Sequence, residues 1–264
     1  MGQGKYTAHI AVVASAVGLS LAVWGAAALM DNEAAARNGS APSAQSPDGK
    51  AKEPAKVRPQ KVPESIAHAA EAGGSAVNIT IDDGPDPRWT PQMLDILKQN
   101  DVKAVFCMVG PMAKQHPDIV KRVVAEGHKL CDHTVSHDTT MDKKSVAYQK
   151  KEIFDAKKMI EEASGGATVE YYRAPGGAFT PDSRRMAAAA GMRPLGWNVD
   201  TKDFEQPGTA SIVNTVKNEL SNGPTILFHD GGGDRAQTVA ALRQVLPWLK
   251  ENGHAFSFPV RTTP

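Results

Sequence analysis

Strand-like and helix-like stretches alternate from Ala76 to Val260, and this alternation restricts the possible folds more than any other feature of the chain. Short runs rich in Val and Ile are followed by amphipathic stretches, several of which begin with a residue typical of a helix start. Repeated βα units require parallel strands, because each helix returns the chain to the same end of the sheet. The pattern predicts an α/β fold, either a closed barrel or a doubly wound open sheet.

The expected boundaries follow from the apolar periodicity and from Gly and Pro positions. The expected strands are Ala76–Asp82, Lys103–Val109, His128–His133, Thr168–Arg173, Met192–Val199, Thr225–Phe228 and Ala255–Val260. The expected helices are Thr90–Asn100, His116–Gly127, Asp142–Ser164, a helix after Thr180, Thr209–Leu220 and Arg235–Asn252.

The first 30 residues have a different composition. Ile10–Met30 contains only apolar residues, Gly and Ser, with Lys5 before it and Asp31 after it. Such a run is long enough to span a bilayer, and the positive flank places the amino terminus inside and the rest outside. Residues 1–30 are therefore predicted to be a signal peptide or an N-terminal membrane anchor. Both possibilities stay open, because Ala26–Ala28 is an acceptable cleavage site. Either way the protein is expected to be extracytoplasmic, secreted or membrane-anchored.

Residues 31–75 are predicted to form a solvated linker. Of these 45 residues 25 are Ala, Pro, Gly or Ser, and none is aromatic or Leu. A segment of this kind buries too little apolar surface to offset the entropy lost on ordering. The folded catalytic domain is accordingly expected at residues 76–264.

Charge and cysteine content exclude several classes of protein. The chain of 264 residues has 30 basic and 29 acidic side chains, and no basic patch is visible, so no nucleic-acid partner is expected. Two cysteines are too few for a disulfide-stapled miniprotein.

Chemically capable side chains gather where the expected strands end. In barrel enzymes this carboxyl-terminal face holds the active site. The clusters are Asp82-Asp83-Gly84 after the first strand, His133 to His137 after the third, Arg173 to Gly177 after the fourth, Asp200 and Asp203 after the fifth, and His229-Asp230 after the sixth.

Each cluster taken alone has an ordinary structural interpretation. The Asp-Asp-Gly-Pro run is typical of a turn. His133 and His137 have the spacing that brings two imidazoles onto one side of a helical turn, as in a two-histidine metal site or on a plain surface. Arg173 could serve in a structural ion pair. Brought together on one face, the clusters supply the ligands, base and acid of a metal-assisted hydrolase.

Five short motifs in this order resemble those of the polysaccharide deacetylases, also called carbohydrate esterase family four or the chitooligosaccharide deacetylase superfamily. The motifs are residues 80–85 (Thr-Ile-Asp-Asp-Gly-Pro), 133–137 (His-Thr-x-x-His), 173–177 (Arg-x-Pro-x-Gly), 200–204 (Asp-x-x-Asp-Phe) and 227–229 (Leu-x-His). The resemblance implies a distorted (β/α) barrel that removes acetyl groups from a polysaccharide with one divalent metal ion. The ion would most often be Zn2+, with Co2+ or Ni2+ as alternatives.

The resemblance also implies a role for each motif residue. Asp83, His133 and His137 would hold the metal, and Asp82 would be the general base. Strand alternation by itself leaves open which of the two aspartates is base and which is ligand. Further roles are implied for Arg173 in orienting Asp82, His229 as general acid, Asp203 in keeping that acid protonated, the Gly176 N–H as an oxyanion donor, and Leu227 and Phe204 as walls of the substrate site.

Two positions depart from the family pattern. Phe204 stands where Trp is usual, and Gly176 stands where Tyr is frequent. Both changes bear on the choice of substrate more than on the reaction, because every ligand and acid–base position is filled.

Several functions remain open at this point. An exported, tethered deacetylase meets a cell wall, so N-acetylglucosamine in peptidoglycan is the first expected substrate, with chitin oligomers and acetylxylan as alternatives. A non-catalytic sugar-binding domain of the cell surface is a further possibility. A glycosidase that uses Asp82 and Asp83 is disfavoured, because adjacent residues are poorly placed to flank a glycosidic bond.

The two cysteines lie near the ends of the second and third expected strands. If these strands are parallel neighbours, Cys107 and Cys131 could form a disulfide. A register offset of one residue would instead point the two thiols apart and leave them free.

Overall fold

A computed structural model describes residues 62–263. The expected signal or anchor segment, and the expected linker up to residue 61, lie outside the described residues. In residues 62–263, no helix combines the length and apolar character needed to cross a bilayer.

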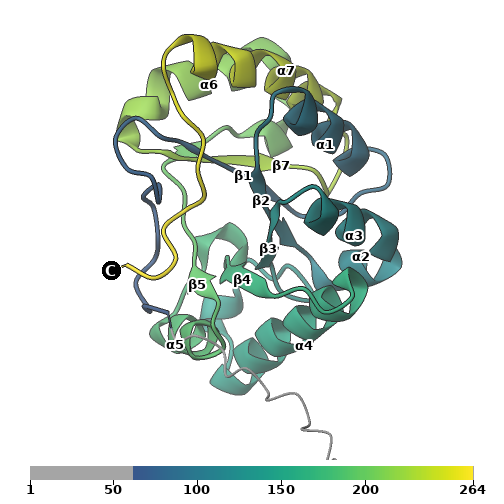
Figure 1. Cartoon of the computed structure of the whole chain (residues 1–264). Helices are drawn as coiled ribbons and strands as arrows, with labels where there is room; N and C mark the ends of the chain where they lie inside the picture. Colours follow the sequence, from purple (N-terminus) through teal and green to yellow (C-terminus); the bar gives the residue numbers. More distant parts are fainter. Residues whose placement is uncertain (1–61, 264) are drawn as a thin grey trace, which may run out of the picture. The chain divides into compact units, whose positions relative to one another are not determined.

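Seven parallel strands form one curled sheet (Figure 1). The order β5-β4-β3-β2-β1-β7-β6 follows the chain cyclically, with β1 beside β7. Strands in a barrel are ordered in this way, whereas a doubly wound sheet reverses its order at a switch point. The fold is therefore the distorted (β/α) barrel. The strands are β1 (Asn78–Asp82), β2 (Ala104–Met108), β3 (Lys129–Asp132), β4 (Val169–Tyr172), β5 (Arg193–Pro194), β6 (Val199–Asp200) and β7 (Thr225–His229).

The expected strand Met192–Val199 is split into two. Its first part, β5, pairs with β4, and its second part, β6, pairs with β7 at the opposite edge of the sheet. Residues 195–198 connect these two edges without belonging to either. One segment thus closes the barrel by pairing with a different neighbour at each of its ends, which is why the closure is distorted.

Helices surround the sheet (Figure 1). They are α1 (Thr90–Gln99), α2 (Gly110–Gln115), α3 (Pro117–Ala125), α4 (Val146–Ser164), α5 (Pro181–Ala189), α6 (Thr209–Glu219) and α7 (Ala236–Glu251). The short helix α2 has too few residues to show helical periodicity, and the sequence did not predict it. A Cβ on Gly110 would lie 2.8 Å from the Ala156 backbone, so glycine allows α2 to pack closely on α4.

Apolar side chains bury both faces of the sheet. Ile79 and Ile81 of β1 point outward and pack with helix residues such as Leu94 in the main core. A smaller cluster lies on the inner face, where Val105 and Tyr171 pack with Leu195. Alternation along β2 separates the two clusters, and in β4 a register shift against β3 moves Tyr171 to the inner face.

The inner cluster is completed by segments from both ends of the described chain. Residues 62–75, assigned to the linker from composition, contact the barrel: Val62, Ala67 and Ala70 are buried, and Ala67 forms a β-bridge with Leu195. The ordered unit therefore extends N-terminal of Ala76. Backbone hydrogen bonds and small buried apolar side chains hold this segment on the barrel. The amino-acid composition of the segment does not reveal such contacts.

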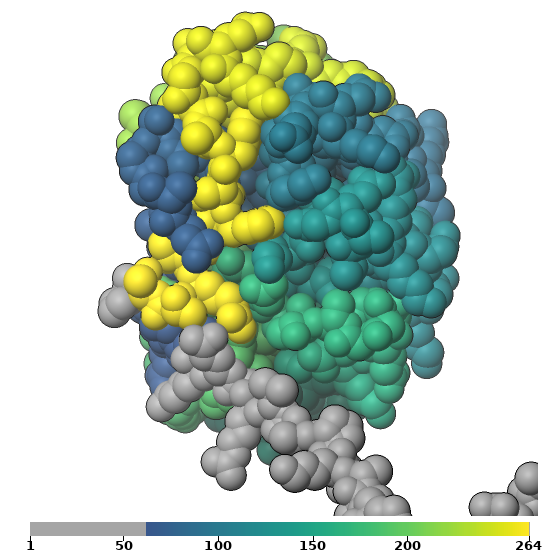
Figure 2. Space-filling model, viewed as in Figure 1, coloured from purple at the N-terminus to yellow at the C-terminus, as the bar shows by residue number. Residues whose placement is uncertain are grey.

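The expected strand Ala255–Val260 is absent. Residues 255–260 instead form two isolated bridges, Val77 with Phe256 and Ala70 with Pro259. This C-terminal segment lies beside the N-terminal one on the same face of the molecule (Figures 1 and 2). Pro259 has no N–H to donate, which disfavours a continuous ladder here.

Cys107 and Cys131 form a disulfide, with Cα atoms 4.1 Å apart. The register of β2 and β3 pairs these two residues directly, so the offset that would have separated the thiols does not occur. The bond crosslinks β2 to β3, the strand that leads directly to His133.

We expect the disulfide to contribute to stability in solution. Replacing Cys107 with Ala and Cys131 with Ser should lower the free energy of unfolding by about 3 kcal/mol, because the bond closes a loop with a sequence separation of 24 residues. Denaturant unfolding of the oxidised protein and of the variant measures this difference. Alkylation of the denatured, unreduced protein provides the control: uptake of two alkyl groups by most molecules would show that the bond does not form.

Candidate active site

The inner face of β1 carries polar side chains toward the end of the strand. Thr80 and Asp82 alternate with the outward-pointing isoleucines and face the interior of the barrel, where both contact Arg173. The guanidinium of Arg173 donates from Nη1 to Asp82 Oδ1 over 2.6 Å. It also donates to the carbonyl oxygens of Leu195 and Gly196. Arg173 is fully buried, so this pair is held away from water at the base of the site.

Asp83 lies on the same side of the barrel as Asp82. The strand β1 ends at Asp82, so the alternation of side chains between the two faces does not continue to Asp83. Its φ of +79° is in the left-handed region, which residues other than glycine rarely adopt. The turn places Asp83 Oδ1 3.1 Å from His137 Nε2 and 3.5 Å from His133 Nε2. Local backbone strain of this kind is typical of functional sites.

The two histidines reach Asp83 from an irregular loop after β3. The helical turn expected for residues 133–137 does not form, because Thr134 and His137 have positive φ values of 69° and 52°. The Glu152 carboxylate of α4 accepts hydrogen bonds from the backbone N–H groups of Val135 and Ser136. A buried acid on a neighbouring helix therefore holds the loop in shape.

Asp83, His133 and His137 fit a divalent metal ion. One potential ligand atom from each lies within 4.8 Å of the others, the one such group in residues 62–263. Asp83 Oδ1 is buried without a hydrogen-bond partner, as expected for an oxygen that binds an ion. His133 Nδ1 lies 2.8 Å from the carbonyl oxygen of Arg173, so the ring donates from Nδ1 and Nε2 faces the cluster.

The charges at this cluster favour a cation. Burial alone would raise the pKa of Asp83, but the neighbouring imidazoles of His133 and His137 hold it well below its usual range. Burial alone would lower the pKa of His133, but the carboxylates of Asp82 and Asp83 raise it. The negative charge of the carboxylates attracts a cation, and one carboxylate with two imidazoles forms a set of ligands suited to zinc and similar ions.

His229, the last residue of β7, is held by Asp203. Its Nδ1 lies 2.7 Å from Asp203 Oδ1, and its backbone N–H donates to Asp203 Oδ2. The Thr238 hydroxyl donates to the same Oδ2, so the Asp203 carboxylate is buried and well bonded. Burial alone would lower the pKa of His229, but Asp203 and, at longer range, Asp82 and Asp83 raise it to about 9.

These groups surround one cavity of about 590 Å³. All residues implied by the sequence resemblance line it except Arg173 and Asp203, which lie behind Asp82 and His229. Leu227 contributes a wall, and Phe204 is 43% exposed with its ring centroid 5.2 Å from that of His229. The remaining lining includes Asp200, which belongs to the cluster expected after the fifth strand but was given no role, and residues that the sequence motifs did not indicate: Thr139, Trp197, Lys202, Gly232 and Arg235.

Only some of these omissions had a signal in the sequence. Asp200 and Lys202 lie within the fourth motif, whereas Arg235 lies outside every motif, two residues after three consecutive glycines. Trp197 lies in the segment expected to be one strand, and its place at the cavity depends on the way that segment splits.

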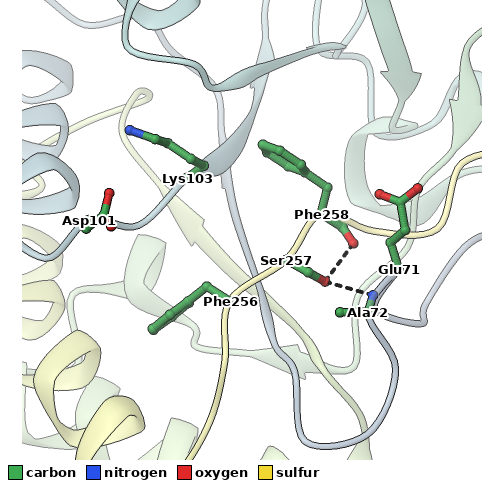
Figure 3. A pocket seen from close by; sticks show the side chains of 7 residues that line it. All are labelled: Glu71, Ala72, Asp101, Lys103, Phe256, Ser257 and Phe258. Atoms are coloured by element: carbon green, nitrogen blue, oxygen red, sulfur yellow. Dashed lines mark hydrogen bonds between the residues drawn. The ribbon is translucent and has the colours of Figure 1, made fainter.

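A second pocket lies near the other end of the strands (Figure 3). Glu71, Lys103 and Phe258 are among its lining residues, and Ser257 Oγ accepts a hydrogen bond from the Ala72 N–H and donates one to the Phe258 carbonyl oxygen. These contacts hold the two terminal segments together. None of the lining residues belongs to the metal-binding group.

Comparison with known proteins agrees with this geometry. The family described as polysaccharide deacetylase matches residues 69–195. A peptidoglycan-N-acetylglucosamine deacetylase of Bacillus cereus is 40% identical over 185 residues, covering 68% of this chain and 84% of the relative. A chitooligosaccharide deacetylase of Sinorhizobium fredii is 35% identical over 204 residues, covering 73% and 92%.

Solved structures show the same fold. A peptidoglycan N-acetylglucosamine deacetylase is 30% identical with a TM-score of 0.69, covering 75% of this chain and 95% of that one. A pseudoenzyme of carbohydrate esterase family four from Bacillus anthracis is 25% identical with a TM-score of 0.67, covering 74% and 67%. Sequence, fold and site together show that this chain belongs to the polysaccharide deacetylase family, carbohydrate esterase family four.

Proposed function

We propose that the protein is a metal-dependent deacetylase that removes N-acetyl groups from a polysaccharide, and that its preferred substrate is N-acetylglucosamine in peptidoglycan. The observation that carries this proposal is one cavity in which the Asp83–His133–His137 group lies beside two oriented acid–base side chains. The names of the relatives from Bacillus cereus and Sinorhizobium fredii support the reaction and the class of substrate.

Asp83, His133 and His137 would hold the ion, and one carboxylate with two imidazoles is a ligand set suited to Zn2+. When bound, the ion would polarise the acetyl carbonyl and make a water molecule easier to deprotonate. Three protein ligands would leave coordination positions free for water and substrate.

Asp82 is suited to accept a proton from the attacking water. Its Oδ1 is bound to Arg173 and its Oδ2 is 3.6 Å from His133 Nε2, so the carboxylate is oriented at the edge of the proposed metal site. A buried guanidinium that orients the base reduces the reorganisation needed when the proton moves. The Gly176 N–H would stabilise the oxyanion, by analogy with the family.

His229 would protonate the departing amine. The carboxylate of Asp203 holds Nδ1, which leaves Nε2 free for the substrate. A pKa raised to about 9 keeps the imidazole protonated at neutral pH, as a general acid requires. Acetate and a free amino sugar would be the products.

The polymer would approach over Phe204 and Trp197, since sugar rings bind aromatic faces. Leu227, 4% exposed, would bound the space for the acetyl group. We further propose that residues 1–30 export or anchor the protein and that residues 31–61 tether the domain outside the membrane, where it would reach the cell wall.

Acetate release from peptidoglycan, chitin oligomers and acetylxylan, measured side by side with Zn2+, tests this function. The proposal expects the highest kcat/KM on peptidoglycan. Zinc binding without acetate release from any of the three would favour a non-catalytic sugar-binding domain; the Bacillus anthracis neighbour is named a pseudoenzyme.

One prediction separates the proposed ligands from the base. His133→Ala and His137→Ala should lose both bound zinc and activity, because each removes a direct metal bond. Asp82→Asn should retain zinc and lose about two to four orders of magnitude in turnover. Metal analysis of the purified variants, together with kcat, tests this assignment. Near-normal activity of Asp82→Asn would contradict it.

Another prediction concerns proton donation by His229. His229→Ala should reduce turnover of an N-acetyl sugar by about two to four orders of magnitude, with a smaller loss on an activated aryl acetate, whose leaving group needs no proton. Parallel kinetics on the two substrates provide the comparison. Equal losses would show that His229 is not the acid.

The link between Asp203 and His229 can be measured without substrate. In the metal-free protein the imidazole of His229 should titrate near pH 9, and in Asp203→Asn its pKa should fall. A raised folded-state pKa stabilises the fold fully below pH 6.5, and this contribution is lost as the pH rises through about 9. NMR titration gives the pKa, with the signals of the distant His116 as a control. An unchanged pKa in the variant would rule out the proposed link.

A further inference from the structure

Arg235 is a buried cation in the catalytic cavity that the proposed reaction does not use. It precedes α7, is 3% exposed and lines the cavity. Its Nε donates to the Gly231 carbonyl oxygen over 2.7 Å, whereas Nη1 is buried without any hydrogen-bond partner. Among residues 62–263 no carboxylate lies within ion-pair distance of it. Burial of an uncompensated charge is unfavourable, so a role for this guanidinium is expected.

The loop before Arg235 brings the guanidinium close to a proposed metal ligand. A Cβ on Gly231 would lie 2.3 Å from the carbonyl oxygen of Asp83, so this loop passes directly against Asp83. A Cβ on Gly232 would lie 3.2 Å from Asp83 Oδ2 and 3.3 Å from Arg235 Nη2. The carboxylate oxygen and the guanidinium therefore face each other across a space that only glycine leaves open.

The two oxygens of Asp83 have different surroundings. Oδ1 faces the imidazoles of His133 and His137, where the ion would bind. Oδ2 is directed toward the loop, on the side of Arg235. A carboxylate that binds a metal through one oxygen is normally held through the other, and such an outer contact orients the ligand.

The other two cations near the cavity are already paired. Arg173 is bound to Asp82, and Lys202 lies 3.4 Å from the Asp200 carboxylate at the β6 side. Among the described residues that line the cavity, Arg235 is thus the remaining arginine or lysine without an ion-pair partner, and its charge is available to attract Asp83 Oδ2.

We propose that Arg235 is a positioning residue for the metal site: its charge holds Asp83 Oδ2, across the gap left by Gly232, so that Oδ1 faces His133 and His137. This inference rests on the metal-dependent function proposed above. Arg235 lies outside the five sequence motifs and binds neither the ion nor the substrate in this role.

The affinity for Zn2+, measured by competition with a chelating indicator in the full-length chain, tests the proposal without reference to catalysis. Arg235→Gln should raise the dissociation constant about 10-fold, the lower end of the range for outer partners of a metal ligand, because the charge acts on Oδ2 across a gap and not through a hydrogen bond. Arg235→Lys should lose less, because the charge remains. Arg243→Gln, an exposed arginine on α7, is the matched control and should bind as the wild type does.

Thermal unfolding of the metal-free variants distinguishes positioning from a general structural role. We expect the metal-free Arg235→Gln protein to melt close to the wild type, because loss of the hydrogen bond from Nε to Gly231 is offset by removal of a buried charge that has no ion-pair partner.

The outcomes are distinct. Zinc binding by folded Arg235→Gln within threefold of the wild type would overturn the inference, and so would a loss of affinity matched by a lower melting temperature of the metal-free variant. A wild-type chain that binds no Zn2+ would instead overturn the proposed metal-dependent function, and this inference with it.

Discussion

The buried ion pair between Arg173 and Asp82 connects the barrel to its site. Arg173 joins four parts of the fold. It follows β4, its guanidinium binds Asp82 and Thr80 of β1 and the carbonyl oxygens of the segment between β5 and β6, and its backbone carbonyl oxygen lies 2.8 Å from His133 Nδ1 in the loop after β3. Removing one partner of the ion pair leaves an isolated buried charge, which is strongly unfavourable. The same residue therefore helps to close the barrel and orients both the proposed base and a proposed ligand.

Departures from regular backbone geometry concentrate the functional groups. An extended β1 would point Asp82 and Asp83 in opposite directions, but the left-handed conformation of Asp83 brings both carboxylates to one cavity. The loop of His133 and His137 depends in the same way on positive φ at Thr134 and His137. Contacts from elsewhere in the fold hold these conformations, among them Glu152 of α4.

Similarity of fold alone does not establish catalysis in this family. A pseudoenzyme shares the barrel with a TM-score of 0.67. Two pairs of side chains support activity instead: Asp82 with Arg173 and His229 with Asp203 each place a candidate proton carrier against a buried partner. In the role proposed for it, Arg235 extends this arrangement to Asp83, the proposed ligand, from a loop whose glycines allow it to approach.

The sequence by itself determined the βα alternation, the strands from β1 to β4 and β7 to within about two residues, and the family motifs, because apolar periodicity and local motif chemistry are written in neighbouring residues. Only the tertiary structure decided that Met192–Val199 divides between two sheet edges, that residues 255–260 form bridges and that residues 62–75 pack on the barrel. It also decided the direct pairing of Cys107 with Cys131 and the places of Trp197 and Arg235 in the cavity. These features depend on pairing and contact between segments distant in the chain, which no local pattern records.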